Sequence, residues 1–458
     1  MTLHELVERE RLRAGVPGCA VVVVRDGEVL MSQGFGAREV DADLPVTTRT
    51  LFQVGSATKT FTAGLLVLLA QEGVLDLDAP LSSYRPGFAM HDPVATAQLT
   101  LRDCLTHRSG LPRHDLIWQA GEGVISRDDV VAALTHLPAT QGFRAGYQYN
   151  NLLYLTAGHV AAGLVGGCYE DVLQERLLAG MPRTLHSVAQ CQDDPDHATP
   201  YLREGDVVKE IPFASLDLAG PAGSIITCAD DLVPWLLTLT GHGVLGSDAL
   251  AQLRTPEIAM PPRGPAGPFT SLGYGLGLMV DRYRGRVVTH HGGNIDGFSA
   301  QVLTRDDGVG IAVLTNLHTS SFRDALPYRL LDELDGVEGP DHSGFFEARL
   351  AALLTQATQE RTAPLVVEPA DAGPLPSYQG VFSHPGYGDV GVEVRDGGLC
   401  WSNRAVTDGR MRHVRDRDFV ASAWLFGGET QLQARFAHDG DLLLQVEPTL
   451  PPLRFARA

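Results

Sequence analysis

Apolar and polar positions alternate in short runs near the start of the chain and then change to a helical period. Residues 18–36 hold an apolar run, an Arg-Asp-Gly turn signal and a second apolar run, which predict a β-hairpin after a short N-terminal helix. Between Gly55 and Gly73 apolar side chains recur at helical spacing, at Phe61, Leu65, Leu68 and Leu69. Because glycine is common just after the last helical turn, we expect an amphipathic helix that ends at Gly73.

The middle of the chain changes from a helical to a strand-like pattern. Residues 99–180 predict mainly helices, residues 181–217 predict a long surface loop, and residues 230–240 predict one more helix. Strand-like runs follow at residues 273–283, 285–293, 297–305 and 309–316, and helical stretches at 322–336 and 344–356. Strands first and last, with helices between and after them, predict an α+β fold. We expect one antiparallel sheet with helices on its faces and with edge strands from both ends of the domain.

The last hundred residues have a different pattern of apolar and polar positions. Residues 357–377 hold four prolines and little periodicity, which is typical of a linker. Residues 378–458 consist of short alternating segments broken by glycine, and they predict a small antiparallel barrel or sandwich of about eight strands. The sequence therefore predicts a catalytic domain over residues 1–356, a linker over 357–377 and a β-barrel domain over 378–458.

Composition and charge narrow the classes of partner. The 458 residues carry a formal net charge of −19, which opposes binding to nucleic acid. No apolar run is long enough to span a membrane, and the N-terminus lacks the apolar core of a signal peptide, so we expect a cytoplasmic protein. Six scattered cysteines without a Cys-x-x-Cys pair, and no His-Glu-x-x-His, argue against a metal site. We expect no metal and no other cofactor.

Lysine is almost absent, because Lys59 and Lys209 are the only two in the chain. Arginine keeps its proton in proteins, whereas a buried lysine can lose it, so a retained lysine is a candidate base. Ser56 precedes Lys59 by three residues at the start of a predicted helix, which places both side chains on one face. A neighbouring base activates a serine nucleophile, either a neutral lysine or a tyrosinate stabilised by the lysine charge. The alternative is a helix-capping serine followed by a solvated lysine.

Two further segments carry candidate site residues. Tyr149 and Asn151 lie in a polar turn before a helix, where the phenol can act as a base and the amide can hold Lys59. The alternative is a capping asparagine beside a packing tyrosine. The third segment runs from His291 to Asn294 at the end of a strand, and the glycines at 292 and 293 suggest a close approach by backbone or ligand. The backbone N–H groups of Ser56 and Asn294 are candidates for an oxyanion hole. The alternative is a glycine-rich turn with an exposed histidine.

In order and spacing, the three segments resemble the motifs of the serine β-lactamase and penicillin-binding-protein superfamily. The likeness is to its class C-like branch of esterases, D-amino-acid peptidases and amidases. Ser56–Lys59 is similar to the Ser-x-x-Lys motif, Tyr149–Asn151 to Tyr-x-Asn, and His291–Gly293 to Lys-Thr-Gly. Residues 99–112, 219–236 and 273–278 extend the resemblance. It implies an additional all-helical lobe, and the tail from residue 378 resembles a lipocalin-like barrel.

The resemblance implies acyl transfer in two steps. Ser56 attacks a carbonyl, Lys59 and Tyr149 handle the proton, Asn151 and His291 complete the catalytic set, and Gly292, Gly293 and Asn294 border the substrate. Superfamily members that recognise penicillin use Lys and Thr to bind a substrate carboxylate, where this chain has His291 and Gly292. We therefore expect a serine hydrolase of esters, amides or D-residue peptides rather than of β-lactams.

Two other functions fit the same motifs. The first is a thioesterase or acyltransferase that takes a peptidyl thioester from a carrier protein and releases or cyclises a nonribosomal peptide. The second is a ligand-binding protein that keeps the fold without turnover. In each case the partner is a small molecule or a peptide, free or carried on a protein. A product assay separates the first two functions, because a hydrolase releases the free acid and a cyclase releases a macrocycle.

Overall fold

The computed structural model describes residues 1–120, 123–261, 268–361, 373–425 and 428–458. Its largest element is an eight-stranded antiparallel sheet with the order β3-β2-β1-β12-β11-β10-β9-β8. The strands are β1 (Gly18–Arg25), β2 (Glu28–Glu39), β3 (Leu44–Pro45), β8 (Phe269–Tyr274), β9 (Met279–Tyr283), β10 (Arg286–Ile295), β11 (Phe298–Arg305) and β12 (Val309–Thr315). The predicted hairpin is β1–β2, and the α+β class predicted from the sequence is confirmed.

The sheet edges differ from the expectation that they come from both ends of the domain. The edges are β3 and β8, whereas β1 and β12, its first and last strands in sequence, pair with each other inside the sheet. Both of these strands are apolar and buried almost throughout, because helices cover both faces there. A strand buried on both faces belongs in the interior of a sheet rather than at its edge.

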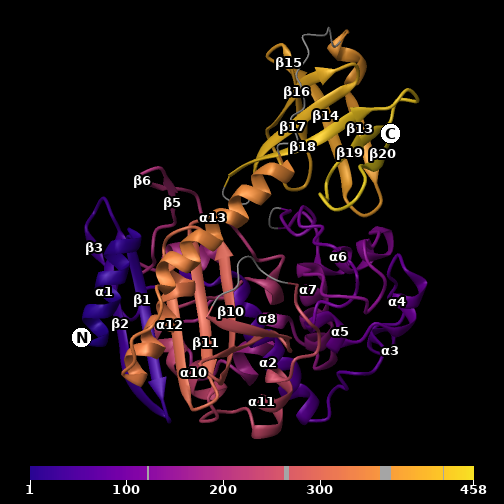
Figure 1. The fold of residues 1–458 in the computed structure, drawn as a ribbon. Helices are drawn as coiled ribbons and strands as arrows, with labels where there is room; N and C mark the ends of the chain where they lie inside the picture. The colour runs from indigo at the N-terminus through magenta and orange to yellow at the C-terminus, as the bar shows by residue number, and fades with distance from the viewer. Residues whose placement is uncertain (121–122, 262–267, 362–372, 426–427) are drawn as a thin grey trace.

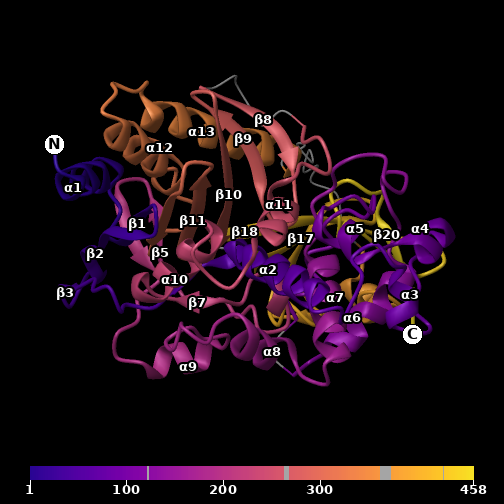
Figure 2. The same ribbon diagram turned by 90° about the horizontal axis from the view of Figure 1, so that it is seen from below.

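Helices pack on both faces of the sheet, as Figure 2 shows from below. One face is covered by α1 (Leu3–Ala14), α12 (Phe322–Asp335) and α13 (His342–Arg361). The other face contacts α2 (Thr58–Gln71) and α10 (Ala229–Leu239), and α11 (Ser247–Arg254) packs on α2. Helix α2 was expected to be amphipathic, but it is buried on nearly all sides. It is a central helix because the sheet packs on one side of it and the helical lobe on the other.

The helical lobe lies beside the sheet, on the far side of α2 (Figure 1). Its helices are α3 (Leu81–Tyr84), α4 (Pro93–Gln98), α5 (Leu101–Leu105), α6 (Arg127–Ala133), α7 (Asn151–Leu164) and α8 (Tyr169–Arg176). The predicted loop over residues 181–217 contains helix α9 (Val188–Asp193) and the hairpin β5 (Tyr201–Glu204) and β6 (Val207–Glu210). The sequence missed this hairpin because its strands are polar and mostly exposed, and only Tyr201 is buried.

The C-terminal segment closes into an antiparallel barrel of eight strands, β13 to β20, which confirms the predicted barrel. They are β13 (Gly380–His384), β14 (Gly388–Arg395), β15 (Gly398–Ser402), β16 (Gly409–Arg415), β17 (Asp418–Leu425), β18 (Gly428–Phe436), β19 (Leu442–Leu444) and β20 (Leu453–Arg457). Figure 1 shows α13 leading from the sheet toward this barrel. Helix α13 ends at Arg361, and residues 362–372 of the expected linker lie outside the described residues. The domain boundaries at 356 and 378 stay a prediction.

No single helix in the described ranges is long and apolar enough to cross a membrane. One bent pair, α7 with α8, meets the criteria of length and composition when its two helices are taken together.

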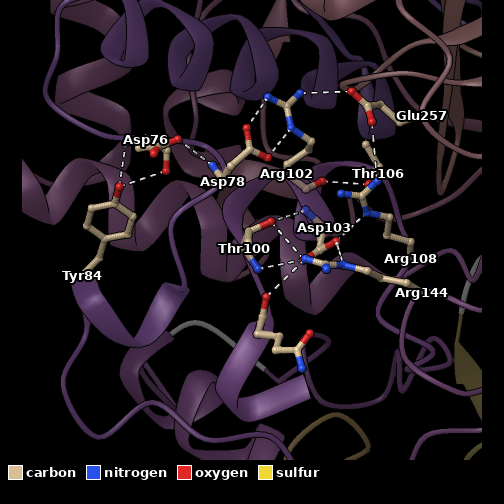
Figure 3. A network of polar contacts seen from close by, with 11 residues as sticks. Asp76, Asp78, Tyr84, Thr100, Arg102, Asp103, Thr106, Arg108, Arg144 and Glu257 are labelled. Carbon is tan, nitrogen blue, oxygen red and sulfur yellow. Dashed lines mark hydrogen bonds and ion pairs between the residues drawn. The ribbon is translucent and has the colours of Figure 1, made fainter. Parts of the chain in front are cut away.

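A buried ion-pair network fixes the loop that leaves α5 (Figure 3). The Asp103 carboxylate is fully buried and accepts hydrogen bonds from Arg144, from Arg108 and from the Thr100 hydroxyl, the last at 2.9 Å. Asp78 pairs with Arg102 in the same network at 2.7 Å, but its side chain is 61% exposed. The hydrogen bonds from Arg144 and Arg108 outweigh burial and lower the pKa of Asp103. The network holds the segment that continues into the candidate site.

We expect Asp103→Asn to destabilise the fold by about 3 kcal/mol, because it leaves two arginines beside a buried site without their charge partner. The matched variant Asp78→Asn should cost under about 1 kcal/mol, because its ion pair is exposed. Since the folded pKa of Asp103 lies below 3.8, its contribution is present above that pH and is lost as the pH falls through the folded pKa. Urea unfolding of both variants at neutral and acid pH measures this, and equal midpoints for the two would contradict it.

Candidate active site

Ser56 and Lys59 lie one turn apart where a short 3-10 helix, η1 (Gly55–Ala57), runs into α2. Lys59 Nζ donates a hydrogen bond to Ser56 Oγ at 3.1 Å. The serine is partly exposed, whereas the lysine side chain is 0% exposed. The alternative of a solvated lysine is therefore wrong. The arrangement instead places a buried amine directly behind an accessible hydroxyl.

Tyr149 and Asn151 reach the same two residues from the start of α7. Tyr149 OH donates a hydrogen bond to Ser56 Oγ at 2.9 Å, and Asn151 Oδ1 accepts one from Lys59 Nζ at 2.8 Å. Asn150 is the residue that caps α7, since its Oδ1 accepts from the backbone N–H of Leu153. With the cap supplied by Asn150, the Asn151 side chain contacts Lys59 instead. The structure thus brings these two residues together with Ser56 and Lys59.

Two of the three hydrogen-bonding positions on the Lys59 amine are taken by oxygen acceptors, and the third faces Ser56. Besides Asn151 Oδ1, the carbonyl oxygen of Ala222 in η3 (Gly220–Ala222) accepts from Nζ at 2.7 Å. Asn151 Nδ2 donates to Asp115 at 3.1 Å, which fixes the amide with its oxygen toward Lys59. A neutral amine has two N–H donors and one lone pair. The charged amine donates to all three oxygens, whereas in the neutral amine Asn151 Oδ1 and the Ala222 carbonyl use both donors. In the neutral form the contact with Ser56 Oγ therefore reverses, and the lone pair of Lys59 accepts from the serine hydroxyl.

Burial shifts the pKa values of Lys59 and Tyr149 in opposite directions. Desolvation lowers the pKa of Lys59 well below 10.5, and the positive charge of Arg113 lowers it further. Desolvation raises the pKa of Tyr149 to about 12, which outweighs the opposite effect of Arg113. Both shifts favour the neutral forms, because burial penalises charge. The alternative of a tyrosinate stabilised by a charged lysine is therefore disfavoured, and a neutral amine beside a neutral phenol is favoured.

Strand β10 carries the third predicted segment and packs directly against η1. A Cβ placed on Gly293 would lie 1.7 Å from the carbonyl oxygen of Val54, so the strand approaches this closely only with glycine. Gly55 has a φ of +50°, and a Cβ there would lie 3.1 Å from the backbone nitrogen of Asn294. The backbone of Asn294 therefore borders the turn that carries Ser56, as a second oxyanion donor requires.

His291 and its neighbour His290 face opposite sides of the sheet, because successive residues of a strand alternate between its two faces. The His291 ring is 1% exposed, not exposed as the alternative assumed, and it packs edge-on against Tyr274 at 5.9 Å. Tyr274 in turn contacts His107, whose ring lies 4.3 Å from that of Tyr149. His291 therefore lies on the same side of β10 as Ser56, within the aromatic cluster that supports Tyr149.

Sequence reasoning missed four residues that surround this set, namely His107, Arg113, Asp115 and Arg323. The guanidinium of Arg113 lies 5.0 Å from the centre of the Tyr149 ring and pairs with Asp115. The pKa of His107 lies well below 6.5 because the ring is fully buried. A signal existed for three of them, since His107 lies inside segment 99–112, which resembles the superfamily, and Arg113 and Asp115 follow that segment directly.

Arg323 fills the space that the missing side chain of Gly292 leaves. A Cβ on Gly292 would lie 2.5 Å from Arg323 Nη1, which donates to the carbonyl oxygens of Gly293 and Ala300 at 2.7 and 2.9 Å. The guanidinium comes from the first turn of α12, more than twenty residues after β10. The guanidinium therefore occupies the place that the Thr side chain of a Lys-Thr-Gly motif would take, although the segment from His291 to Asn294 itself contains no Lys or Arg.

A cavity of about 1080 Å³ borders this set at Arg113 and Asn294, and Ser56, Lys59 and Tyr149 are not among its lining residues. Arg113, Gly292, Asn294 and Arg323 line its polar end, and Phe269, Tyr328, Phe346 and Leu350 are among the residues of its apolar wall. No group of three or more His, Cys, Asp or Glu side chains within the described parts of the chain is arranged to hold a metal ion. The site offers a nucleophile, an amine and a phenol, and the cavity lies next to it, beyond Arg113 and Asn294.

Comparisons with known proteins place the chain among enzymes of one fold. The family model described as Beta-lactamase matches residues 3–335. Unguisins hydrolase ungD of Aspergillus violaceofuscus is 27% identical over 92% of this chain and 82% of its own length. The octameric penicillin-binding protein homologue from Pyrococcus abyssi superposes with a TM-score of 0.64 at 21% identity, covering 97% of this chain and 98% of that one. A D-stereospecific amidohydrolase from Streptomyces sp. gives a TM-score of 0.56 at 27% identity, over 69% of this chain and 94% of that one.

Proposed function

We propose that this chain, which belongs to the beta-lactamase family and is a serine hydrolase, forms an acyl-Ser56 intermediate from an ester or amide of a small peptide-like substrate. The observation that carries the proposal is that Ser56 Oγ lies within hydrogen-bond distance of both Lys59 Nζ, at 3.1 Å, and Tyr149 OH, at 2.9 Å. A serine with only a structural role needs neither a buried amine nor a phenol. A ligand-binding protein without turnover likewise has no use for a base beside the serine.

The proposed acylation step starts with both Lys59 and Tyr149 in their neutral forms. Ser56 Oγ bonds to the substrate carbonyl carbon while its proton passes to the lone pair of Lys59 Nζ. As the tetrahedral intermediate collapses, the bond to the leaving nitrogen or oxygen breaks and Tyr149 OH gives that atom a proton. The proton held by Lys59 then restores the phenol. In the second step water attacks the acyl carbon, the bond to Ser56 Oγ breaks, and the serine regains its proton.

The backbone N–H groups of Ser56 and Asn294 are proposed to stabilise the oxyanion of the tetrahedral intermediate. Ser56 N–H lies in the first turn before α2, where the helix macrodipole adds positive potential. The close packing of Gly55 and Gly293 between η1 and β10 fixes the position of the second donor. Donors held rigidly before the reaction are worth more than mobile ones, because they need no reorganisation as charge develops.

Peptide-like substrates with D-residues are the proposed substrate class. The relatives include an unguisins hydrolase and a D-stereospecific amidohydrolase. The guanidinium of Arg323 gives the cavity a positive group beside Gly292, where the sequence had indicated a weakened anchor. We propose that it faces a carbonyl or carboxylate oxygen of the substrate. We also propose a cytoplasmic location, with which six cysteines that form no disulfide bond are compatible.

The proposed base predicts the pH dependence of acylation. Lys59 must be neutral to accept a proton, so the rate should rise with pH through its lowered pKa, with a midpoint well below 10.5. The rate should then stay level until Tyr149 loses its proton near its raised pKa of about 12. The rate of Ser56 labelling by a fluorophosphonate, measured across pH, gives the rising part of this profile, because fluoride leaves without a proton from Tyr149. A midpoint at 10.5 or above would contradict a desolvated lysine base.

We expect Tyr149→Phe to lower the rate of amide hydrolysis by roughly two or more orders of magnitude, the usual contribution of a general acid. The loss should be smaller for a p-nitrophenyl ester, because its leaving group departs without a proton. Tyr147→Phe is the matched control, since that ring packs against His107 from the same segment. Steady-state kinetics on both substrates decides, and equal losses for ester and amide would refute the role in protonating the leaving group.

A product assay tests the proposed reaction. The substrates are p-nitrophenyl esters, D-amino-acid amides, nitrocefin and a peptidyl thioester. Free acid from the esters, the D-amides and the thioester, with little turnover of nitrocefin, supports the hydrolase. A macrocycle as the main product of the thioester identifies a cyclising thioesterase instead, with a carrier protein as the partner. Turnover of nitrocefin alone would refute the proposed substrate class.

A further inference from the structure

One contact between the C-terminal barrel and the helical lobe centres on His114. Tyr387, in the turn between β13 and β14, lies with its hydroxyl 2.6 Å from His114 Nδ1. Glu447, which follows β19, accepts a hydrogen bond from the backbone N–H of His114 at 3.0 Å. Both barrel residues and His114 are buried, at 5%, 4% and 0% exposure. The contact is therefore a closed hydrogen-bonded junction between segments more than 270 residues apart.

The hydrogen bonds at this junction determine how His114 is held. Its Nε2 lies 3.2 Å from the carbonyl oxygen of Pro138, which can only accept, so Nε2 carries the proton and Nδ1 accepts from Tyr387 OH. The backbone of His114 has a φ of +48°, a left-handed conformation that is rare for residues other than glycine. Glu447 fixes that backbone through its N–H, while its other oxygen accepts from Thr449. The barrel thus contacts both the ring and the backbone N–H of His114.

The two neighbours of His114 in sequence contact the proposed catalytic groups. Asp115 accepts from Asn151 Nδ2 at 3.1 Å, and this bond turns the Asn151 oxygen toward Lys59. Arg113 lies over the Tyr149 ring at 5.0 Å. Because both residues are joined to His114 by one peptide bond, the position of His114 sets the position of both.

We propose that Tyr387 and Glu447 are positioning residues for the reaction, and that the barrel acts by fixing His114 so that Arg113 and Asp115 hold Tyr149 and Asn151 in place. This inference rests on the proposed function of Ser56. It assigns the barrel a part in the chemistry although neither barrel residue contacts the reacting atoms. A barrel that served only for assembly would not need a buried carboxylate and a phenol on one residue of this loop.

The test uses the full-length variants Tyr387→Phe, Glu447→Gln and the two combined. The readouts are the second-order rate of Ser56 labelling by a fluorophosphonate, its pH midpoint, and the thermal midpoint. We expect labelling to slow by roughly ten- to a hundredfold in the double variant, in line with small displacements of catalytic groups. The pH midpoint should rise for two reasons. Arg113 lowers the pKa of Lys59 more than Asp115 raises it, so displacement of both residues raises that pKa, and water that enters the loosened site reduces the desolvation of the amine. Tyr149, Tyr154 and His107, which also face Lys59, are unchanged in these variants.

The matched controls remove comparable buried groups far from the site. Tyr201→Phe deletes a hydroxyl that accepts from the backbone N–H of Val40, and Glu10→Gln alters a carboxylate of α1 that is 7% exposed. They should lower the thermal midpoint without changing the labelling rate or its pH midpoint. Barrel variants that label at the wild-type rate, or whose loss merely follows their thermal midpoint as in the controls, overturn the inference. If the double variant does not fold, Tyr387→Phe alone decides. Failure of the wild-type protein to label at Ser56 would refute the proposed function instead.

Discussion

Ser56→Ala is expected to lower kcat for every hydrolysed substrate by roughly five to six orders of magnitude, as removal of a serine nucleophile does in other serine hydrolases. Without the hydroxyl, Lys59 and Tyr149 lose the atom on which their hydrogen bonds converge. Only the oxyanion donors and the substrate contacts remain. Steady-state kinetics with a p-nitrophenyl ester, at enzyme concentrations high enough to detect the residual rate, measures the loss.

Ser299→Ala is the matched control for this variant. Ser299 is a buried serine of β11 whose hydroxyl lies 2.8 Å from Thr315 Oγ1 within the sheet. It should keep wild-type turnover with at most a modest loss of stability. Activity of the Ser56 variant within tenfold of wild type would mean that another residue is the nucleophile.

Lys59→Arg is expected to lower the acylation rate by roughly three to four orders of magnitude. Arginine keeps its positive charge at any pH compatible with folding, so it cannot accept the Ser56 proton. The buried position also lacks space for a guanidinium, because Nζ already contacts Asn151 and the carbonyl oxygen of Ala222. Lys59→Met, which is neutral and similar in length, separates loss of the base from loss of folding, since it should fold and yet remain as inactive.

The chain supplies its own control, because Lys209 is the only other lysine. Its ammonium group pairs with Glu204 at the surface, and 55% of its side chain is exposed. Lys209→Arg should leave both activity and stability unchanged. Near wild-type acylation by the Lys59→Arg variant, with its thermal midpoint intact, would show that the amine is not the base.

The elements with the strongest periodicity were predictable from the sequence. The hairpin β1–β2, the helices α2 and α10, the strands β9 to β12 and the eight-stranded barrel all follow apolar patterns that local geometry imposes. The family resemblance inferred from three short motifs is confirmed by the match over residues 3–335. What the pattern could not give is the pairing of β1 with β12, because burial of both strand faces depends on helices that come from distant parts of the chain.

For the candidate site, a spacing of three residues was enough to place Ser56 beside Lys59, although the first lies in η1 and the second in α2. The spacing could not identify the residues around them. Arg113 and Asp115 lie in a loop without periodicity, and their position depends on a left-handed backbone at His114. Arg323 reaches Gly292 from helix α12, so the motif in the segment from His291 to Asn294 gives no indication of this contact. Tertiary contacts of this kind have no local signature, and they decide the charge and the burial that set the pKa of Lys59.

The central claim is that Ser56 is the nucleophile of an acyl-enzyme. The most direct measurement is mass spectrometry of the wild-type protein after treatment with a fluorophosphonate and digestion with trypsin, which cuts after Arg49 and Lys59. We expect a single adduct on the peptide of residues 50–59, located on Ser56 by fragmentation, in step with the loss of esterase activity. An adduct on any other residue, or full inactivation with Ser56 unmodified, would contradict it.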